Sequence, residues 1–354
     1  MLLISETLTN IIQFLIKKNI PLYIKMLKQQ SAERSEYKPG QSLLFKFEQA
    51  SPIDWSTASL SFKVGYQSVV SVGWSIGSAQ NVIKDIRVYK DGKIVEQIRS
   101  YNSYALHRDR LFTPYQELKT KGSLMGYNAG SYFLANDEET IIHTIQSNFD
   151  NGDEFTIPLR VISNLFEQVW TAEEIKIEIV LASAANAFRS SDSQLTDYTL
   201  TDPKIFYGCA DKELTMPFTK VKTLRYSLDG TDPQINIDLD SISSLPVERC
   251  LLVTRDESVI GDVEESSLRS ESYNYKNIQI RNDFVEYFNQ PVKSANELYH
   301  YVLKGETSVS IEQFKLNLSA IVWEGRQNNS YVELEYNTGR ARFIEIFVEH
   351  IGTH

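Results

Sequence analysis

The stretch that most constrains the fold is residues 82–98, whose sequence VIKDIRVYKDGKIVEQI predicts a β-hairpin. In its first arm Ile86 and Val88 point to one face, and polar side chains alternate with them. Asp91-Gly92 supplies a tight two-residue turn, since both residue types tolerate the left-handed backbone that such turns need. The return strand then begins with the apolar residues Ile94, Val95 and Ile98.

The first arm of this hairpin recurs later in the chain. Residues 276–283, KNIQIRND, align with residues 84–91, KDIRVYKD, at a constant offset of 192 residues (276 against 84). A segment suited to a helix follows each copy, at residues 101–118 and 295–303. A repeated strand followed by a repeated helical insertion predicts one β-domain used twice, with chance similarity over eight residues as the alternative.

Composition sets the class of protein. A chain of 354 residues suits two domains of ordinary size, and its 19 tyrosines and 17 phenylalanines favour packed β-structure over disorder. The net charge of −10 includes no block of Lys and Arg, which argues against direct nucleic-acid binding. Two cysteines, Cys209 and Cys250, indicate a reducing compartment, and the sequence leaves open whether they form a disulfide.

Residues 1–30 differ from everything after them. Leu and Ile recur there at helical spacing, which predicts an amphipathic helix that lies on a membrane or under a neighbouring subunit. A helix packed on its own domain is the alternative. A signal peptide does not fit, because Glu6 stands where basic residues belong. The candidate contact residues are Leu8, Ile11, Ile12, Leu15, Ile16, Lys17 and Lys18.

Short strands separated by turns account for most of the remaining chain. The predicted strands of the first half are residues 42–48, 59–66, 68–76, 82–98 as the hairpin, 141–145, the start of 154–166, 174–182 and 198–207. Those of the second half are 221–228, 234–239, 249–254, 275–281, 314–323, 331–336 and 342–349. Seven or eight short strands per half with few helices indicate a sandwich or jelly roll, whose alternate apolar residues form the core.

We find no catalytic, cofactor-binding or metal-binding constellation in the sequence. The five histidines are scattered without the spacing of metal ligands, and no P-loop, G-x-G-x-x-G or G-x-S-x-G motif is present. His107 and Asp109, in the first helical insertion, are interpreted as a polar surface. The four tryptophans are interpreted as core packing rather than as a platform for sugars, namely Trp55, Trp74, Trp170 and Trp323.

The order of several short motifs resembles that of major capsid proteins of the double jelly-roll lineage (adenovirus and tectivirus lineage), above all the adintovirus-, polinton- and virophage-like members. In the first half the resemblance lies in Tyr37-Lys38-Pro39-Gly40, Ser59-Leu60-Ser61-Phe62, Tyr101-Asn102-Ser103-Tyr104 and Ile157-Pro158-Leu159 with Leu165-Phe166. In the second half it lies in residues 245–253, 274–281 and Phe288-Asn289-Gln290-Pro291. The chain departs from the family in its short length, in Val247 and Glu248 inside the "P-R" strand, and in a truncated Gly-Tyr region at Gly126-Tyr127.

The resemblance implies an all-β fold of two consecutive eight-stranded jelly-roll sandwiches with short helical insertions and an N-terminal amphipathic helix. It implies an arm at residues 1–36, a first roll at 37–212 and a second at 213–354. The expected function is structural: homotrimers form pseudo-hexagonal capsomers that tile an icosahedral virion shell, assembled in the host cytoplasm or nucleus. Expected partners are neighbouring capsomers, penton and minor capsid proteins, and an internal membrane reached by the arm. No cofactor, nucleic-acid contact or enzymatic activity is expected.

Two other functions are compatible with a sandwich fold. An attachment protein that binds glycans would carry a cluster of aromatic side chains on surface loops. A jelly-roll glycoside hydrolase would hold two facing acids in a cleft, one with a shifted pKa.

Overall fold

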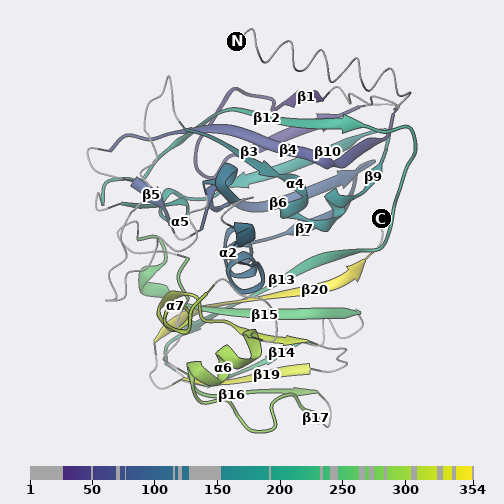
Figure 1. Cartoon of the computed structure of the whole chain (residues 1–354). Coiled ribbons are helices and arrows are strands. Elements are labelled where there is room, and N and C mark those ends of the chain that lie inside the picture. Colours follow the sequence, from purple (N-terminus) through teal and green to yellow (C-terminus); the bar gives the residue numbers. More distant parts are fainter. Residues whose placement is uncertain are drawn as a thin grey trace.

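The computed structural model describes residues 27–48, 51–68, 72–75, 77–114, 116–118, 122–126, 153–190, 193–231, 234–239, 246–262, 268–270, 275–282, 285–303, 309–324, 330–336 and 340–352. Within them the chain forms two stacked groups of antiparallel sheets, one above the other in Figure 1. We call the group formed by residues 28–209 the first roll and the group formed by residues 218–352 the second roll. The predicted helix at residues 1–30 and the predicted strand at 141–145 lie outside the described residues.

The first roll consists of two main sheets and a short pair of strands. One sheet has the order β1 (Lys28–Ser31), β12 (Thr199–Cys209), β4 (Ile53–Gly65) and β8 (Glu154–Pro158), with β2 (Glu36–Tyr37) beside β12 and β9 (Val169–Trp170) beside β4. The other has the order β3 (Ser42–Phe47), β10 (Ile175–Leu181), β6 (Ile83–Lys90) and β7 (Lys93–Ile98). The short pair is β5 (Val72–Trp74) with β11 (Phe188–Ser190).

The second roll consists of two four-stranded sheets. One has the order β13 (Phe218–Asp229), β20 (Ala341–Gly352), β15 (Val247–Asp256) and β18 (Ile321–Glu324). The other has the order β14 (Gln234–Asp238), β19 (Ser330–Tyr336), β16 (Tyr275–Asn282) and β17 (Val285–Glu286).

The two rolls share one connectivity. When the eight main strands of each roll are numbered along the chain, both rolls pair them as 1-8-3-6 in one sheet and 2-7-4-5 in the other. Eight strands arranged in two sheets with this connectivity form a jelly roll. The fold class predicted from the sequence, two consecutive eight-stranded jelly rolls with helical insertions, is therefore confirmed for the described residues.

The sequence repeat falls on equivalent strands. β6 and β16 are each the third strand of their four-stranded sheet, and each is followed by a short partner, β7 or β17. Ile86 of β6 pairs with Ile179 of β10, and Ile278 of β16 pairs with Leu334 of β19. Because all four side chains are buried, the repeated Ile marks the same inward-facing position in both cores.

The predicted hairpin at residues 82–98 is confirmed. Asp91 and Gly92 both have positive φ, at 49° and 78°, which is the geometry of the mirror-image turn that matches strand twist. The Asp91 carboxylate accepts a hydrogen bond of 3.0 Å from the backbone N–H of Glu174, and this bond ties the turn to the start of β10.

Helices fill the same gap in the strand order of each roll. α2 (Tyr101–Phe112) lies between β7 and β8, and α6 (Ala295–Val302) and α7 (Ile311–Asn317) lie between β17 and β18. Other short helices among the described residues are η1 (Ala79–Val82), η2 (Gly122–Met125), α4 (Leu159–Ile162), η3 (Asn164–Glu167), α5 (Ala184–Ala187) and η5 (Glu257–Val259).

Two strand predictions are wrong in part. Residues 314–323 were expected to form one strand, but α7 occupies Ile311–Asn317 and β18 only Ile321–Glu324. Ser310 and Gln313 form a reciprocal capping box there, which fixes a helix start, and the buried Phe314 and Leu318 are four residues apart, as on one helical face. Of residues 68–76, the described strand is Val72–Trp74.

Aromatic side chains form much of the core of the first roll. Trp55 stacks on Trp170, with ring centroids 5.1 Å apart, and meets Phe47 edge to face at 5.2 Å. Trp74 stacks on Phe188 at 5.2 Å. All four tryptophans are buried, with at most 2% of their surface exposed, so their interpretation as core packing is confirmed.

Candidate functional site: the junction between the two rolls

The helix α2 lies where the two rolls meet. Figure 1 shows it below β7 of the first roll and above β13 and β20 of the second. Ten of its twelve residues are buried, including the polar side chains of Asn102, His107, Asp109 and Arg110. Because a buried polar group is costly without a partner, the contacts of these side chains decide whether the junction holds. We use "junction" for α2 together with the strands β13, β15 and β20 that it faces.

A closed circuit of contacts joins α2 to two strands of the second roll. The Tyr104 hydroxyl donates a 2.8 Å hydrogen bond to Oε1 of Glu349 on β20. Glu349 in turn accepts from both Nε and Nη2 of Arg249 on β15, at 3.1 and 2.8 Å. The Arg249 guanidinium lies 3.8 Å from the ring centroid of Phe112, at the end of α2. Burial, followed by the charge of Glu349, raises the pKa of Tyr104 well above its usual value.

His107 extends the junction on the same helix. Its Nδ1 lies 2.9 Å from the backbone oxygen of Ser103, and its Nε2 lies 3.1 Å from Oγ of Ser270, in the second roll. Since a carbonyl oxygen only accepts, Nδ1 carries the proton and the neutral ring accepts the Ser270 hydroxyl at Nε2. Burial lowers the pKa of His107 to about 4, so the ring is neutral at pH 7.

The interpretation of His107 and Asp109 as a polar surface is therefore wrong. Their exposed fractions are 0% and 5%. The sequence predicts a helix with charged residues on several sides. In an isolated helix such residues face solvent, which is why a polar surface was predicted. In the structure His107 contacts Ser270 of the second roll, and Asp109 is enclosed by its own helix and by η1 of the first roll. Asp109 is ion-paired with Arg108 at 2.6 Å and accepts a 2.8 Å hydrogen bond from Gln80.

A second set of charges joins the rolls at the start of α2. Arg225 of β13 donates to Oγ of Ser100 at 2.5 Å and lies 3.4 Å from the Asp85 carboxylate of β6. Its Nε lies 3.7 Å from Glu345 of β20, which is fully buried and also paired with Arg255 at 3.0 Å. Because Glu345 is fully buried, loss of its cationic partners would leave its charge unpaired at a cost of roughly 3–5 kcal/mol.

The candidate contact residues of the N-terminal arm, from Leu8 to Lys18, lie outside the described residues. Among the described residues, no cluster of three or more His, Cys, Asp or Glu side chains has the arrangement of a metal site. Nor does any helix in those ranges have the length and apolar character needed to cross a membrane. Cys209 and Cys250 are both free thiols, and burial raises the pKa of Cys250.

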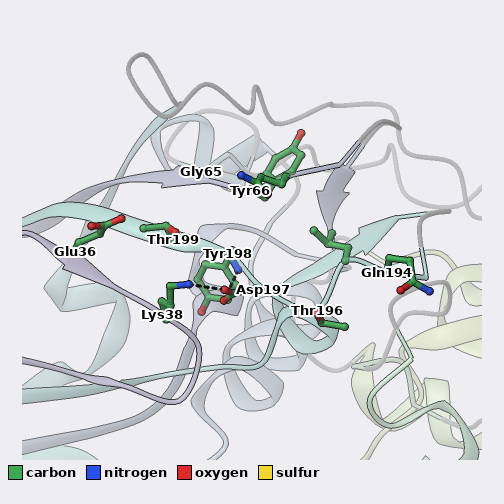
Figure 2. A pocket seen from close by; sticks show the side chains of 11 residues that line it. Glu36, Lys38, Gly65, Tyr66, Gln194, Thr196, Asp197, Tyr198 and Thr199 are labelled. Carbon is green, nitrogen blue, oxygen red and sulfur yellow. Dashed lines mark hydrogen bonds and ion pairs between the residues drawn. The ribbon is translucent and has the colours of Figure 1, made fainter.

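A surface pocket of about 420 Å³ lies on the first roll, between the start of β12 and the residues around β2. Figure 2 shows its polar lining, in which Lys38 and Asp197 form an ion pair of 2.8 Å. The Tyr198 hydroxyl is used by the core, since it donates to the backbone oxygen of Ala182 at 2.9 Å. The lining thus holds a satisfied ion pair, together with amides, hydroxyls and Glu36.

Sequence reasoning missed the junction itself. Its members come from α2 and from several segments of the second roll that lie more than one hundred residues away in the chain, and no local pattern joins them. The repeat predicted equivalent helical insertions in the two halves, but it gave no sign that the first of them contacts the second roll.

No protein-family model and no curated protein sequence matches the chain. Solved structures do match. The mavirus major capsid protein aligns with a TM-score of 0.59 at 10% identity, over 94% of this chain and 88% of that one. The Faustovirus major capsid protein aligns with a TM-score of 0.56 at 6% identity, over 92% and 89%. VP54 of PBCV-1 aligns with a TM-score of 0.55 at 8% identity, over 92% and 94%. The chain has the double jelly-roll fold that these proteins share.

Proposed function

We propose that the chain is the major structural protein of an icosahedral viral shell. The observation that carries the proposal is the pair of rolls with identical strand order, which aligns along nine-tenths of the chain with viral capsid proteins. On this proposal the protein has a structural role and no catalytic one. It is a component of the virion, assembled in the host cytoplasm or nucleus.

The fold also supports a specific assembly. Two similar rolls per chain give six similar lobes when three chains close into a ring, so a homotrimer has the outline of a hexagon. Such a ring closes through heterologous contacts, in which the first roll of one copy meets the second roll of the next. The buried junction supports this role, because it fixes the angle between the two lobes of each chain. Pseudo-hexagonal capsomers of this kind would tile the shell with penton and minor capsid proteins.

The proposed division of the chain is an arm at residues 1–36, a first roll at 37–212 and a second at 213–354. Strand pairing supports a division a few residues after 212, since Leu214 bridges Val169 of β9 in the first roll and β13 begins at Phe218. Within the arm, Lys28–Ser31 forms β1 and pairs with β12, so the last part of the arm adds a strand to the first roll.

We place the contact with an internal membrane or with neighbouring capsomers in the part of the arm before β1, at Leu8 to Lys18. A chain lacking residues 2–26 keeps β1 and should form trimers that fail to close into shells. A matched variant replaces Lys17 and Lys18 by Gln and should weaken binding to anionic vesicles if the arm contacts a membrane. Normal shells from the truncated chain would contradict this assignment.

Size and shape test the main proposal directly. Light scattering of the purified chain should give three times the chain mass of 40.6 kDa, and electron micrographs should show hexagonal particles. A monomer whose melting temperature rises on adding glycans would overturn the proposal in favour of an attachment protein. Hydrolysis of a glycoside, abolished by replacing one acid, would overturn it in favour of an enzyme.

A further inference from the structure

One buried carboxylate lies at a further contact between the rolls, where the edge strand β7 meets the edge strand β13. We call this contact the seam. Glu96 on β7 is 3% exposed, whereas Ile94, two residues earlier and across a β-bulge, is 52% exposed. A buried carboxylate without a cation bonded to it needs several donors, and the seam supplies them.

Three donors from three elements converge on Glu96. Ser163 Oγ donates to Oε2 at 3.0 Å, and the backbone N–H of Gln97 donates to Oε1 at 3.0 Å. The backbone N–H of Val221 on β13 donates as well. Ser163 also caps η3, since its Oγ accepts from the backbone N–H of Leu165 at 3.2 Å. One side chain therefore ties β7, the start of η3 and the edge of the second roll together.

The charged groups around Glu96 come from each element of the seam. Lys220 of β13 acts on it across the seam and favours the ionised form. Lys222, Arg99 and His350 line the same groove, whose volume is about 360 Å³.

The other elements packed against Glu96 contribute little opposing charge. On β6 the residue opposite Glu96 is the apolar Val88, and Arg87 of that strand is paired with Glu178. The charged residues of α4 and η3 are Arg160 and Glu167. Burial outweighs the donors and Lys220, and it raises the pKa of Glu96 from 4.5 to about 7.

We propose that Glu96 makes the seam between the two rolls proton-sensitive, so that proton uptake tightens the seam and proton release loosens it. When the seam opens, water reaches the carboxylate and its pKa returns toward 4.5. The closed seam therefore holds the proton more tightly than the open one. The free energy that favours the closed seam is largest below pH 4.5. It decreases as the pH rises toward 7 and changes little at higher pH.

Hydrogen exchange of the full chain tests this directly. After correction for the intrinsic pH dependence of exchange, the opening constant measured at the amides of Val221 and Gln97 should rise by roughly tenfold per pH unit between about pH 5 and 7. In the E96Q chain the side chain at position 96 is neutral at every pH, so the opening constant should not change with pH. E173Q removes an exposed carboxylate on the same roll and should keep the slope of the unchanged chain.

A second variant keeps the test decisive if E96Q fails to fold. S163A removes a donor that favours the ionised form, so the midpoint of the exchange profile should move to higher pH. A flat profile in the unchanged chain would overturn the proposal. So would a slope in E96Q equal to that of the unchanged chain.

Discussion

The helices inserted at the same point of the two rolls have opposite surroundings. α2 of the first roll buries ten of its twelve residues against both rolls, whereas α6 of the second buries two of eight, Leu298 and Val302. Those two are four residues apart and form a narrow apolar stripe of the usual surface kind. The helix at this insertion point therefore joins the two rolls in the case of α2, and packs on the surface of a single roll in the case of α6.

The starts of the two helices show the cost of joining. α6 begins at Ser294, whose Oγ accepts from the backbone N–H of Glu297 at 3.2 Å. α2 begins at Ser100, which has a left-handed backbone with φ of 49° and makes no side-chain cap. The Ser100 hydroxyl accepts from Arg225 of the second roll instead. The first helix gives up a local cap and accepts strained backbone, and it gains a contact between rolls.

The largest expected difference between the insertions concerns Glu349, which α2 reaches through Tyr104. Glu349→Ala leaves Arg249 and the Tyr104 hydroxyl without their shared partner, so the free energy of unfolding should fall by roughly 3–5 kcal/mol. Denaturant unfolding of the full chain measures it. Glu297→Ala on α6 is the matched control and should cost about 1 kcal/mol or less. If the two variants lose the same free energy of unfolding, the contacts of α2 with the second roll stabilise the protein no more than the contacts of α6 within its own roll.

The next effect concerns pH, because two buried groups between the rolls titrate in opposite directions. The pKa of His107 is lowered from 6.5 to about 4. Its contribution to the free energy of unfolding is therefore full above pH 6.5 and is lost as the pH falls through 4. The pKa of Glu96 is raised from 4.5 to about 7, so its contribution is full below pH 4.5 and is lost as the pH rises through 7. Each shift corresponds to about 3 kcal/mol.

Together these contributions nearly cancel, so the stability of the unchanged chain should vary little with pH on their account. Single variants should reveal the two slopes. E96Q should become more stable as the pH rises from 4 to 6.5, and His107→Gln should become less stable between pH 4.5 and 7. Thermal unfolding at constant ionic strength across this range measures both. Parallel profiles for the two variants would contradict the opposed titrations.

Local chemistry explains which features could be predicted from the sequence. The Asp91-Gly92 turn and the alternation in β10 depend on neighbours in the chain, and both are confirmed. The two rolls were predictable because an inward-facing Ile recurs at the same strand position. The helix at Ile311–Asn317 was missed because the spacing of Phe314 and Leu318 also fits a strand, and the capping box that marks the helix start was not considered. The junction was not predictable, since its contacts, such as that of His107 with Ser270, join residues far apart in the chain.

The smallest expected effect tests the helix starts themselves. Ser294→Ala removes an ordinary cap from α6 and should cost about 1 kcal/mol. Ser100→Ala keeps the strained backbone and leaves Arg225 without its closest acceptor, so it should cost more, about 1–3 kcal/mol. Ser100→Gly separates the two causes, because glycine adopts positive φ without strain and recovers part of that loss. If Ser100→Ala costs no more than Ser294→Ala in denaturant unfolding, the contact with Arg225 contributes nothing beyond a cap, and the left-handed residue at the start of α2 needs another explanation.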